Sequence, residues 1–394
     1  MGVADMNRKE VLKIDKEKIV PTYTRYDIVA ETGKGAKCVD ACGKEYIDFT
    51  SGIGVNSLGF CDEGWVRAVT EQLSKLQHVS NLYYTEPQLK VANILTQRTG
   101  LAKVFFGNSG AEANEAAIKT ARKYGNVVKG IENNKIITLQ NSFHGRTMAT
   151  ITATGQNHYH KYFTPFPEGF AHCEAGNLAQ LKSLVDDTTC AIMVELIQGE
   201  GGVIELDKEY VKAVEKICKE KDILFIIDEV QTGIGRTGKL FAYQHFNIKP
   251  DIVTFAKGIA GGLPVGGALM NEKCCDILQP GDHGTTYGGN PVACAGAAYI
   301  LSVMDEVFLD EVTSKGEYLK EKLMQISAVK NVSGTGLMLG AEIEGKTAAD
   351  TVKECLELGL MVLTAKNKVR FLPPLTITYE ELDEGIKIFR KALA

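Results

Sequence analysis

Two stretches of sequence decide the fold: ILFIIDEVQTG at residues 223–233 and DIVTFAKGIAGGLPVGG at residues 251–267. Each is a short apolar run that ends abruptly in polar or glycine-rich sequence, which is typical of a strand buried on both faces of a parallel sheet. Earlier in the chain are three apolar runs of the same kind, with helical patterns between them: VFF at residue 104, IITL at 136 and AIMVEL at 191. This alternation predicts an α/β fold whose large domain is a mostly parallel sheet covered by helices.

The sequence on either side of this unit predicts a second, smaller domain. Over residues 20–50, glycines separate short segments with a strand pattern. After residues 284–289 the sequence again shows a helical pattern, followed by strand patterns and one more helical pattern. Such a mixture favours a compact α+β domain. We therefore expect three segments: residues 1–49 as an N-terminal part of the small domain, 50–295 as the large domain, and 296–394 as the C-terminal small domain.

Composition excludes several classes of partner. The 394 residues carry 44 basic and 49 acidic side chains, a net charge of -5, so no basic field is present to hold nucleic acid or an anionic membrane. No run approaches the roughly 20 apolar residues of a membrane span, and the N-terminus lacks the apolar core of a secretory signal. Ten scattered cysteines without C-x-x-C or zinc-finger spacing indicate reduced thiols in the cytoplasm and no metal site.

Polar residues at two strand ends are candidates for chemistry, because ligands of such sheets bind beyond the carboxyl ends of the strands. Asp228 ends the first quoted run and needs a cationic partner, although a structural or metal-binding aspartate fits the same pattern. Lys257 follows the second run and is surrounded by glycines. Desolvation there lowers the pKa of a lysine and makes its amine nucleophilic, whereas the alternative is a surface lysine.

Two further segments carry weaker signals. VFFGNSGAEANEAAIKTAR at residues 104–122 reads as a strand followed by a helix whose free N-terminal amides could bind phosphate. An ordinary capped helix explains the same residues, because its charges also suit the helix dipole. HGTTYGGN at residues 283–290 indicates only a polar loop.

Taken together, these segments resemble the fold-type I pyridoxal-phosphate enzymes and, among them, the class III aminotransferases. The resemblance lies in the Asp-Glu-x-Gln strand end, the lysine after the next strand and the H-G-T-T-Y-G-G-N loop, which follow in order. It covers nearly the whole chain. It implies a large domain with a mostly parallel seven-stranded sheet, a smaller α+β domain, pyridoxal 5'-phosphate as cofactor and a homodimer with shared active sites.

The resemblance also implies a role for each matching residue near the cofactor ring. Lys257 resembles the lysine that forms a Schiff base with the cofactor, and Asp228 the partner of the pyridine nitrogen. Gln231 is implied as a neighbour of the ring hydroxyl. Val230 is similar to the residue that packs on one ring face, and Phe143, in N-S-F-H-G-R-T, to the aromatic that covers the other.

Contacts to the phosphate and the substrate follow from the same resemblance. Gly110 and Ala111 would offer amides to the phosphate, and Thr286 would reach it from the other subunit. The implied substrate contacts are Thr285, a carboxylate-binding Arg146, a carboxylate clamp at Arg370, and Glu195 as the partner that neutralises an active-site arginine between half-reactions.

V-E-x-I-Q-G-E-G-G at residues 194–202 and V-R-F-x-P-P-L at 369–375 are most similar to the acetylornithine branch of this family. That branch implies transfer of the terminal amino group of N2-acetyl-L-ornithine to 2-oxoglutarate, giving N-acetyl-L-glutamate 5-semialdehyde and L-glutamate, as in arginine biosynthesis. Ornithine, succinylornithine and 4-aminobutyrate remain open as donors. Two departures, Ser333 for an arginine and Leu263–Gly267 for Phe-Pro-Ile-Gly-Ala, bear on the donor, and we expect neither to touch the chemistry.

A nucleotide hydrolase is the rival interpretation. Residues 340–347 read G-A-E-I-E-G-K-T and match the P-loop pattern, while ILFIIDE resembles the acidic strand that accompanies it. Glu342 and Glu344 would however place negative charge inside an anion-binding loop. We therefore expect LMLGAEI to continue as a strand through the supposed loop.

Overall fold

The computed structural model describes residues 7–394. Its largest element is a seven-stranded sheet in which β12 runs antiparallel to both neighbours and the other four pairings are parallel. In spatial order the strands are β4 (Lys103–Gly107), β12 (Gly266–Met270), β11 (Ile252–Phe255), β10 (Leu224–Asp228), β7 (Thr189–Val194), β5 (Lys135–Leu139) and β6 (Phe170–Cys173). The predicted mostly parallel seven-stranded sheet is confirmed.

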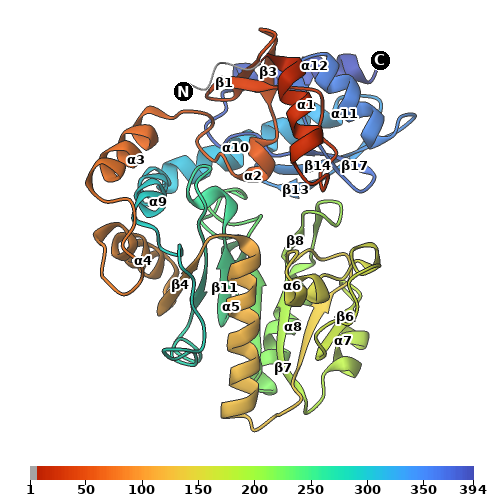
Figure 1. The fold of residues 1–394 in the computed structure, drawn as a ribbon. Helices are drawn as coiled ribbons and strands as arrows, with labels where there is room; N and C mark the ends of the chain where they lie inside the picture. The colour runs from red at the N-terminus through yellow and green to blue at the C-terminus, as the bar shows by residue number, and fades with distance from the viewer. Residues whose placement is uncertain (1–6) are drawn as a thin grey trace.

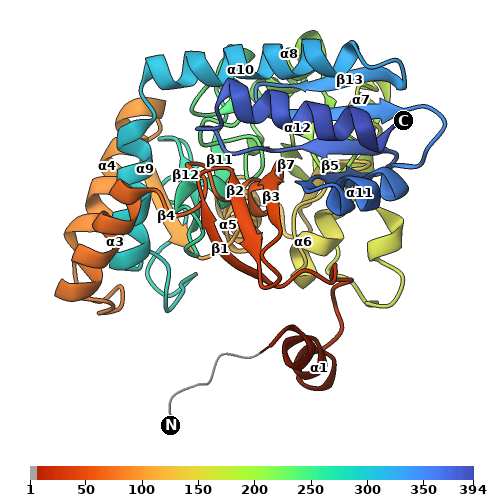
Figure 2. The same ribbon diagram turned by 90° about the horizontal axis from the view of Figure 1, so that it is seen from above.

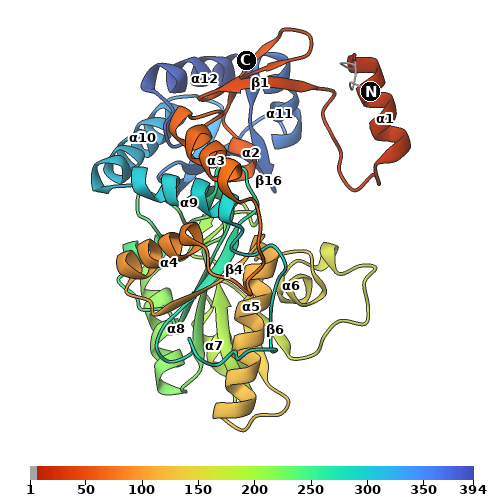
Figure 3. The same ribbon diagram turned by 60° about the vertical axis from the view of Figure 1, so that its left-hand side comes forward.

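The apolar runs form central strands because each must fill a core on both faces. Along β10, Phe225 and Ile227 belong to one hydrophobic core, while Leu224 and Ile226 belong to a second core on the opposite face. Helix α5 (Gly110–Lys123) covers the second core, and α7 (Leu178–Leu184) and α8 (Lys208–Glu220) contribute to the first. Figure 3 shows α5 and α8 on opposite sides of the sheet.

Two four-stranded sheets form the other lobe, at the top of Figure 1. The first contains β1 (Ala30–Lys34), β2 (Lys37–Asp40), β3 (Glu45–Asp48) and β15 (Leu360–Met361), and the second β13 (Val329–Thr335), β14 (Met338–Ile343), β17 (Lys368–Phe371) and β16 (Leu363–Ala365). Helices α10 (Glu306–Met324), α11 (Ala348–Glu357) and α12 (Tyr379–Ala392) pack with them.

The pairing of β3 with β15 places an early and a late segment of the chain in one sheet. We propose on this basis that residues 1–49 and 296–394 form one small domain and residues 50–295 the large domain. Residues 1–6 of the first segment lie outside the part of the chain that the structure describes.

Helices α3 (Glu63–Lys75), α4 (Glu86–Thr99) and α9 (Pro291–Val303) pack together beside the large sheet, at the left of Figure 1. Helix α1 (Arg8–Lys18) buries no residue and stands apart from both lobes in Figures 2 and 3. The remaining elements are α2 (Ser51–Gly54), α6 (Met148–Ala153), β8 (Ile197–Gln198), β9 (Ile204–Glu205) and the short helices η1 (Tyr124–Val128), η2 (Asn157–Tyr159), η3 (Ala242–His245) and η4 (Lys257–Ile259).

No single helix within residues 7–394 has both the length and the apolarity to cross a membrane. Helices α9 and α10 have this length and apolarity only when they are counted as one segment, and they are bent by 78° relative to each other.

The P-loop match at residues 340–347 forms no phosphate-binding loop. Strand β14 continues to Ile343, as we expected. Lys346, which would have to reach a phosphate, donates instead to the carbonyl oxygen of Ala392 at 2.8 Å and lies 3.6 Å from the Glu354 carboxylate. The nucleotide-hydrolase interpretation is therefore wrong.

Replacing Phe225 by alanine tests the packing of the central sheet. The Phe225 side chain is 1% exposed in the middle of β10, so its removal should lower the free energy of unfolding by about 3–5 kcal/mol. The matched control is Phe163→Ala, since Phe163 is 52% exposed and should be nearly neutral. Urea denaturation followed by circular dichroism measures both, and equal midpoints for the two variants would contradict this core.

Candidate active site

A cavity of about 410 Å³ opens at the carboxyl ends of the parallel strands. Its walls come from the start of α5, the segment after β5, the ends of β7 and β10, and the turn after β11. Of the predicted site residues, it is lined by Gly110, Ala111, Phe143, Arg146, Glu195, Asp228, Val230, Gln231 and Lys257. Leu263, Pro264 and Val265, which belong to one of the two departures from the family pattern, also line it.

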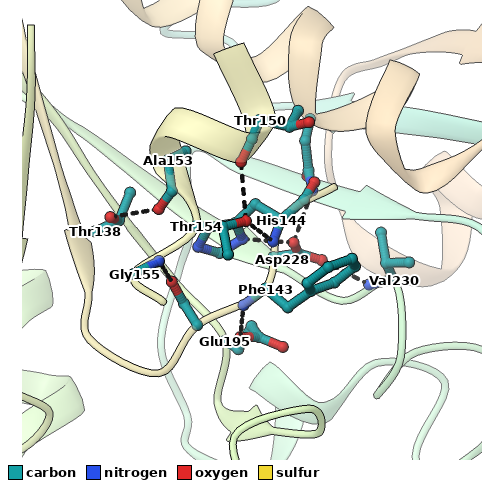
Figure 4. A network of polar contacts seen from close by, with 12 residues as sticks. Thr138, Phe143, His144, Thr150, Ala153, Thr154, Gly155, Glu195, Asp228 and Val230 are labelled. Carbon is teal, nitrogen blue, oxygen red and sulfur yellow. Dashed lines mark hydrogen bonds and ion pairs between the residues drawn. The ribbon is translucent and has the colours of Figure 1, made fainter. Parts of the chain in front are cut away.

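The Asp228 carboxylate is buried and held by three hydrogen bonds. The Asn114 amide donates to Oδ2 at 2.7 Å, Nδ1 of His144 lies 2.8 Å from the same oxygen, and the Val230 amide donates to Oδ1 at 3.0 Å (Figure 4). Within residues 7–394, no lysine or arginine lies within 4.0 Å of this carboxylate. A buried acid that is hydrogen-bonded but lacks a strong cationic partner is suited to a cationic group of a ligand.

His144 and Asn114 form a supporting layer that sequence reasoning missed. The His144 amide donates to Oγ1 of Thr154 at 2.9 Å, and Asn114 also donates to the His144 carbonyl oxygen at 2.7 Å (Figure 4). Both side chains keep one buried polar atom, Nε2 and Oδ1 respectively, without a partner in the described part of the chain. Sequence position offers a signal for each. His144 lies between the predicted residues Phe143 and Arg146 in F-H-G-R, and Asn114 lies one helical turn after Gly110.

Lys257 follows β11 after one residue, Ala256, and adopts a left-handed backbone conformation, with φ of 47°. Side chains other than glycine rarely occupy this region, so the surrounding structure must hold the lysine there. Its ammonium makes no hydrogen bond and no ion pair within residues 7–394. Burial lowers the pKa of Lys257 below its ordinary value, although the Glu200 carboxylate opposes that effect. The structure thus presents a nucleophilic amine to the cavity.

The N-terminus of α5 presents free amides to the same cavity. The Ser109 hydroxyl caps the helix by accepting from the Glu112 amide at 3.2 Å, while the amides of Gly110 and Ala111 have no acceptor in the described chain. A Cβ atom at Gly110 would lie 2.6 Å from Cγ1 of Val230, so glycine permits this close approach. Free amides at the positive end of a 14-residue helix form an anion site.

Glu195 lies beneath Phe143. Its Oε2 atom accepts from the Phe143 amide at 2.9 Å (Figure 4). Burial, reinforced by the charge of Asp228, raises the pKa of the Glu195 carboxyl well above its ordinary value. The neighbouring Arg146 is exposed and makes no hydrogen bond or ion pair among the described residues.

Arg370 is paired with Glu200 rather than with Glu195. Its Nη1 donates to Oε1 of Glu200 at 2.6 Å and to Oε1 of Gln231 at 2.9 Å. Burial raises the pKa of the Glu200 carboxyl, but the neighbouring Arg370 charge outweighs burial and keeps this pKa below its ordinary value. Glu195, predicted as the partner of an active-site arginine, follows the end of β7 and forms no ion pair with an arginine among residues 7–394, so that role stays a prediction. Glu200 lies in the same glycine-rich run and could have been found there.

Thr285, Thr286 and Arg370 are not among the residues that line the cavity, although Arg370 contacts the lining residue Gln231. Oγ1 of Thr285 accepts from the Asn108 side chain at 2.9 Å, and Asn108 does line it. Thr286 is exposed and makes no hydrogen bond within residues 7–394. Over the same residues, no group of three or more histidine, cysteine, aspartate or glutamate side chains is arranged to hold a metal ion.

Comparison with known proteins matches this architecture to one family. The family model "Aminotransferase class-III" matches residues 20–393. The acetylornithine aminotransferase of Haemophilus ducreyi is 50% identical over 391 residues, which are 99% of this chain and 100% of that protein. The crystal structure of the N-acetylornithine aminotransferase of Stenotrophomonas maltophilia is 34% identical, with a TM-score of 0.84 over 97% of this chain and 98% of that one.

The ornithine aminotransferase of Toxoplasma gondii is similar in structure across the whole chain. Its TM-score is 0.94 at 31% identity, covering 100% of this chain and 96% of that one. A second structure of that enzyme, with a TM-score of 0.92, is described as showing partial occupancy of PLP at the active site.

The chain therefore belongs to the class III aminotransferases, with the fold-type I architecture of pyridoxal-phosphate enzymes. It is an enzyme that moves an amino group between an amino donor and a keto acid.

The raised pKa of Glu195 predicts a specific dependence of stability on pH. The folded state holds this proton more tightly than the unfolded state, so the contribution of Glu195 is lost as pH rises above its ordinary pKa of 4.5. Glu195→Gln keeps an acceptor for the Phe143 amide but does not titrate. Its urea midpoint should rise relative to the wild type between pH 5 and pH 8. A difference that stays constant or shrinks over this range would show that Glu195 is ionised in the folded state.

Proposed function

We propose that this chain transfers the terminal amino group of N2-acetyl-L-ornithine to 2-oxoglutarate, using pyridoxal 5'-phosphate bound at Lys257. The products are N-acetyl-L-glutamate 5-semialdehyde and L-glutamate. The observation that carries the proposal is the unpaired Lys257 in the same cavity as Asp228 and the free amides of α5. The similarity to acetylornithine aminotransferases over full length supports this choice of donor.

The residues of the cavity fit the proposed cofactor group by group. An amine without a partner at Lys257 suits an aldehyde, and a buried carboxylate without a lysine or arginine partner suits a protonated pyridine nitrogen. The free amides of Gly110 and Ala111 suit a phosphate. Val230 and Phe143 line the space between these groups and suit the faces of a flat ring. Gln231 accepts a hydrogen bond from Arg370, yet it also lines the cavity and would neighbour a ring hydroxyl.

When bound, the cofactor supplies an aldehyde for the amino group and an electron-withdrawing ring that stabilises negative charge on the substrate carbon. The protein binds, orients and moves protons. Asp228, fixed by Asn114 and His144, would hold a proton on the ring nitrogen. The amine of Lys257 would accept the proton of the substrate carbon at its Nζ atom, since its lowered pKa leaves it neutral more readily.

The two arginines suit substrates that differ in charge. Acetylornithine carries one carboxylate, whereas 2-oxoglutarate and glutamate carry two. Arg146 has no carboxylate partner and is free to bind an anion, while Arg370 is neutralised by Glu200. A substrate with one carboxylate leaves the Glu200 pair intact, and a dicarboxylate replaces Glu200 with its second carboxylate. Thr285 is proposed as a further substrate contact, because its hydroxyl binds Asn108, which lines the cavity.

The proposal includes a cytoplasmic homodimer in which Thr286 binds the phosphate in the partner subunit. Thr286 is exposed, and Asn81 binds the carbonyl oxygens of Thr285 and Gly288, which joins this loop to the segment before α4. That segment exposes Leu82 by 87% and Tyr84 by 94%. Exposed apolar side chains of this kind mark an interface. Sedimentation equilibrium of the active enzyme should give the mass of two chains, and an active monomer would overturn this part of the proposal.

A comparison of donors tests the reaction. Purified enzyme with added cofactor should form glutamate from 2-oxoglutarate and acetylornithine, with a higher kcat/KM than with succinylornithine, ornithine or 4-aminobutyrate. A higher kcat/KM with another donor would change the assigned substrate. Absence of glutamate with every donor would overturn the proposed function.

Asp228→Asn tests the assignment of the ring-nitrogen partner. Asparagine is close in shape but carries no charge to hold the proton on the ring, so kcat should fall on the order of 100-fold or more. Steady-state kinetics measure this loss, with Asp187→Asn as a matched control because Asp187 is exposed and makes no hydrogen bond among the described residues. If D228N retains the kcat of the control, Asp228 has no such role.

A further inference from the structure

Arg146 and Arg370 are held in physically different ways. Arg370 forms an ion pair with Glu200, whereas Arg146 has no carboxylate within 4.0 Å in the described chain. Its guanidinium lies over the ring of Tyr159, 4.5 Å from the ring centroid, and 5.5 Å from the centroid of Phe143. Aromatic faces attract a cation without neutralising it. Arg146 is therefore oriented yet keeps its full charge and its N–H donors for a ligand.

Tyr159 is rigidly connected to the segment that carries Arg146. Tyr159 is the last residue of the short helix η2. The residues just before η2 form hydrogen bonds with the segment that follows β5. The side chain of Gln156 donates to the Ser142 carbonyl oxygen at 2.9 Å, and the Gly155 amide donates to the Ser142 hydroxyl at 3.0 Å. These bonds tie the chain just before Tyr159 to the residue that precedes Phe143.

Tyr159 also contacts Phe143, which is proposed to cover the cofactor ring. The two rings lie 5.5 Å apart in an edge-to-face arrangement with an angle of 60°. The ring of His158 lies against Tyr159 with centroids 3.9 Å apart. The Tyr159 hydroxyl makes no hydrogen bond within residues 7–394, so the contacts that matter are those of its ring.

We propose that Tyr159 is a positioning residue for substrate carboxylates, acting through Arg146. Its ring holds the Arg146 guanidinium at the cavity and braces the edge of Phe143. A carboxylate in place of Tyr159 would compete with the substrate for Arg146, whereas an aromatic ring orients the cation and leaves it free. The inference rests on the proposed function, in which Arg146 binds a substrate carboxylate.

The test measures binding of glutarate, a dicarboxylate without keto or amino group, to the holoenzyme by titration calorimetry. Tyr159→Leu should weaken binding about 3- to 30-fold, the range expected for loss of a cation–π contact. Tyr159→Phe keeps the ring and should stay within about twofold of the wild type. Tyr162→Leu is the matched control, because Tyr162 is 77% exposed and lies outside the cavity lining. KM for 2-oxoglutarate should rise in Y159L more than kcat falls.

A double-mutant cycle separates positioning from packing. In an Arg146→Ala background, Tyr159→Leu should cause no further loss of glutarate affinity, since the contact is already gone. An unchanged affinity in Y159L, or an equal loss with and without Arg146, would overturn the inference. Tyr159→Met provides a second apolar replacement if Y159L does not fold. Failure of the wild-type enzyme to form glutamate from any donor would overturn the proposed function instead. The glutarate titration measures binding alone and does not require that activity.

Discussion

The whole site depends on a buried carboxylate for which the described chain supplies no lysine or arginine partner. Asp228 ends β10, and Lys257 follows the neighbouring strand β11, so the parallel pairing of these strands brings both groups to one edge of the sheet. Burying such groups is costly unless hydrogen bonds compensate. Asn114, His144 and the Val230 amide supply them to Asp228, while the amine of Lys257 has no hydrogen-bond or ion-pair partner among residues 7–394. In the proposed function, a ligand with a cationic nitrogen and an electrophilic carbon would complete the arrangement.

Contacts of Arg370 beside the cavity join the two lobes. Arg370 belongs to β17 of the small lobe, yet its guanidinium binds Glu200 and Gln231 of the large lobe. A substrate carboxylate that reaches Arg370 must therefore exchange with Glu200, whereas one that reaches Arg146 displaces only solvent. We propose that this difference lets the site accept substrates of two charge types in the successive halves of an amino transfer.

The sequence was sufficient for features that are local along the chain. Apolar runs before Asp228 and Lys257 predicted the central strands and the position of both residues beyond the strand ends, because strand period and burial are evident in consecutive residues. The Arg370–Glu200 pair joins residues from different lobes, and no local pattern distinguishes Glu200 from Glu195. His144, Asn114 and Tyr159 were missed for the same reason, since their roles arise only where α5, β5 and η2 meet. The role of Thr286 stays a prediction.

Reduction of the holoenzyme with borohydride, followed by peptide mass spectrometry, tests the central claim most directly. The account predicts that the peptide containing Lys257 gains the mass of a reduced pyridoxyl phosphate group and that no other lysine does. A protein that remains unlabelled, or is labelled at a different lysine, would contradict it.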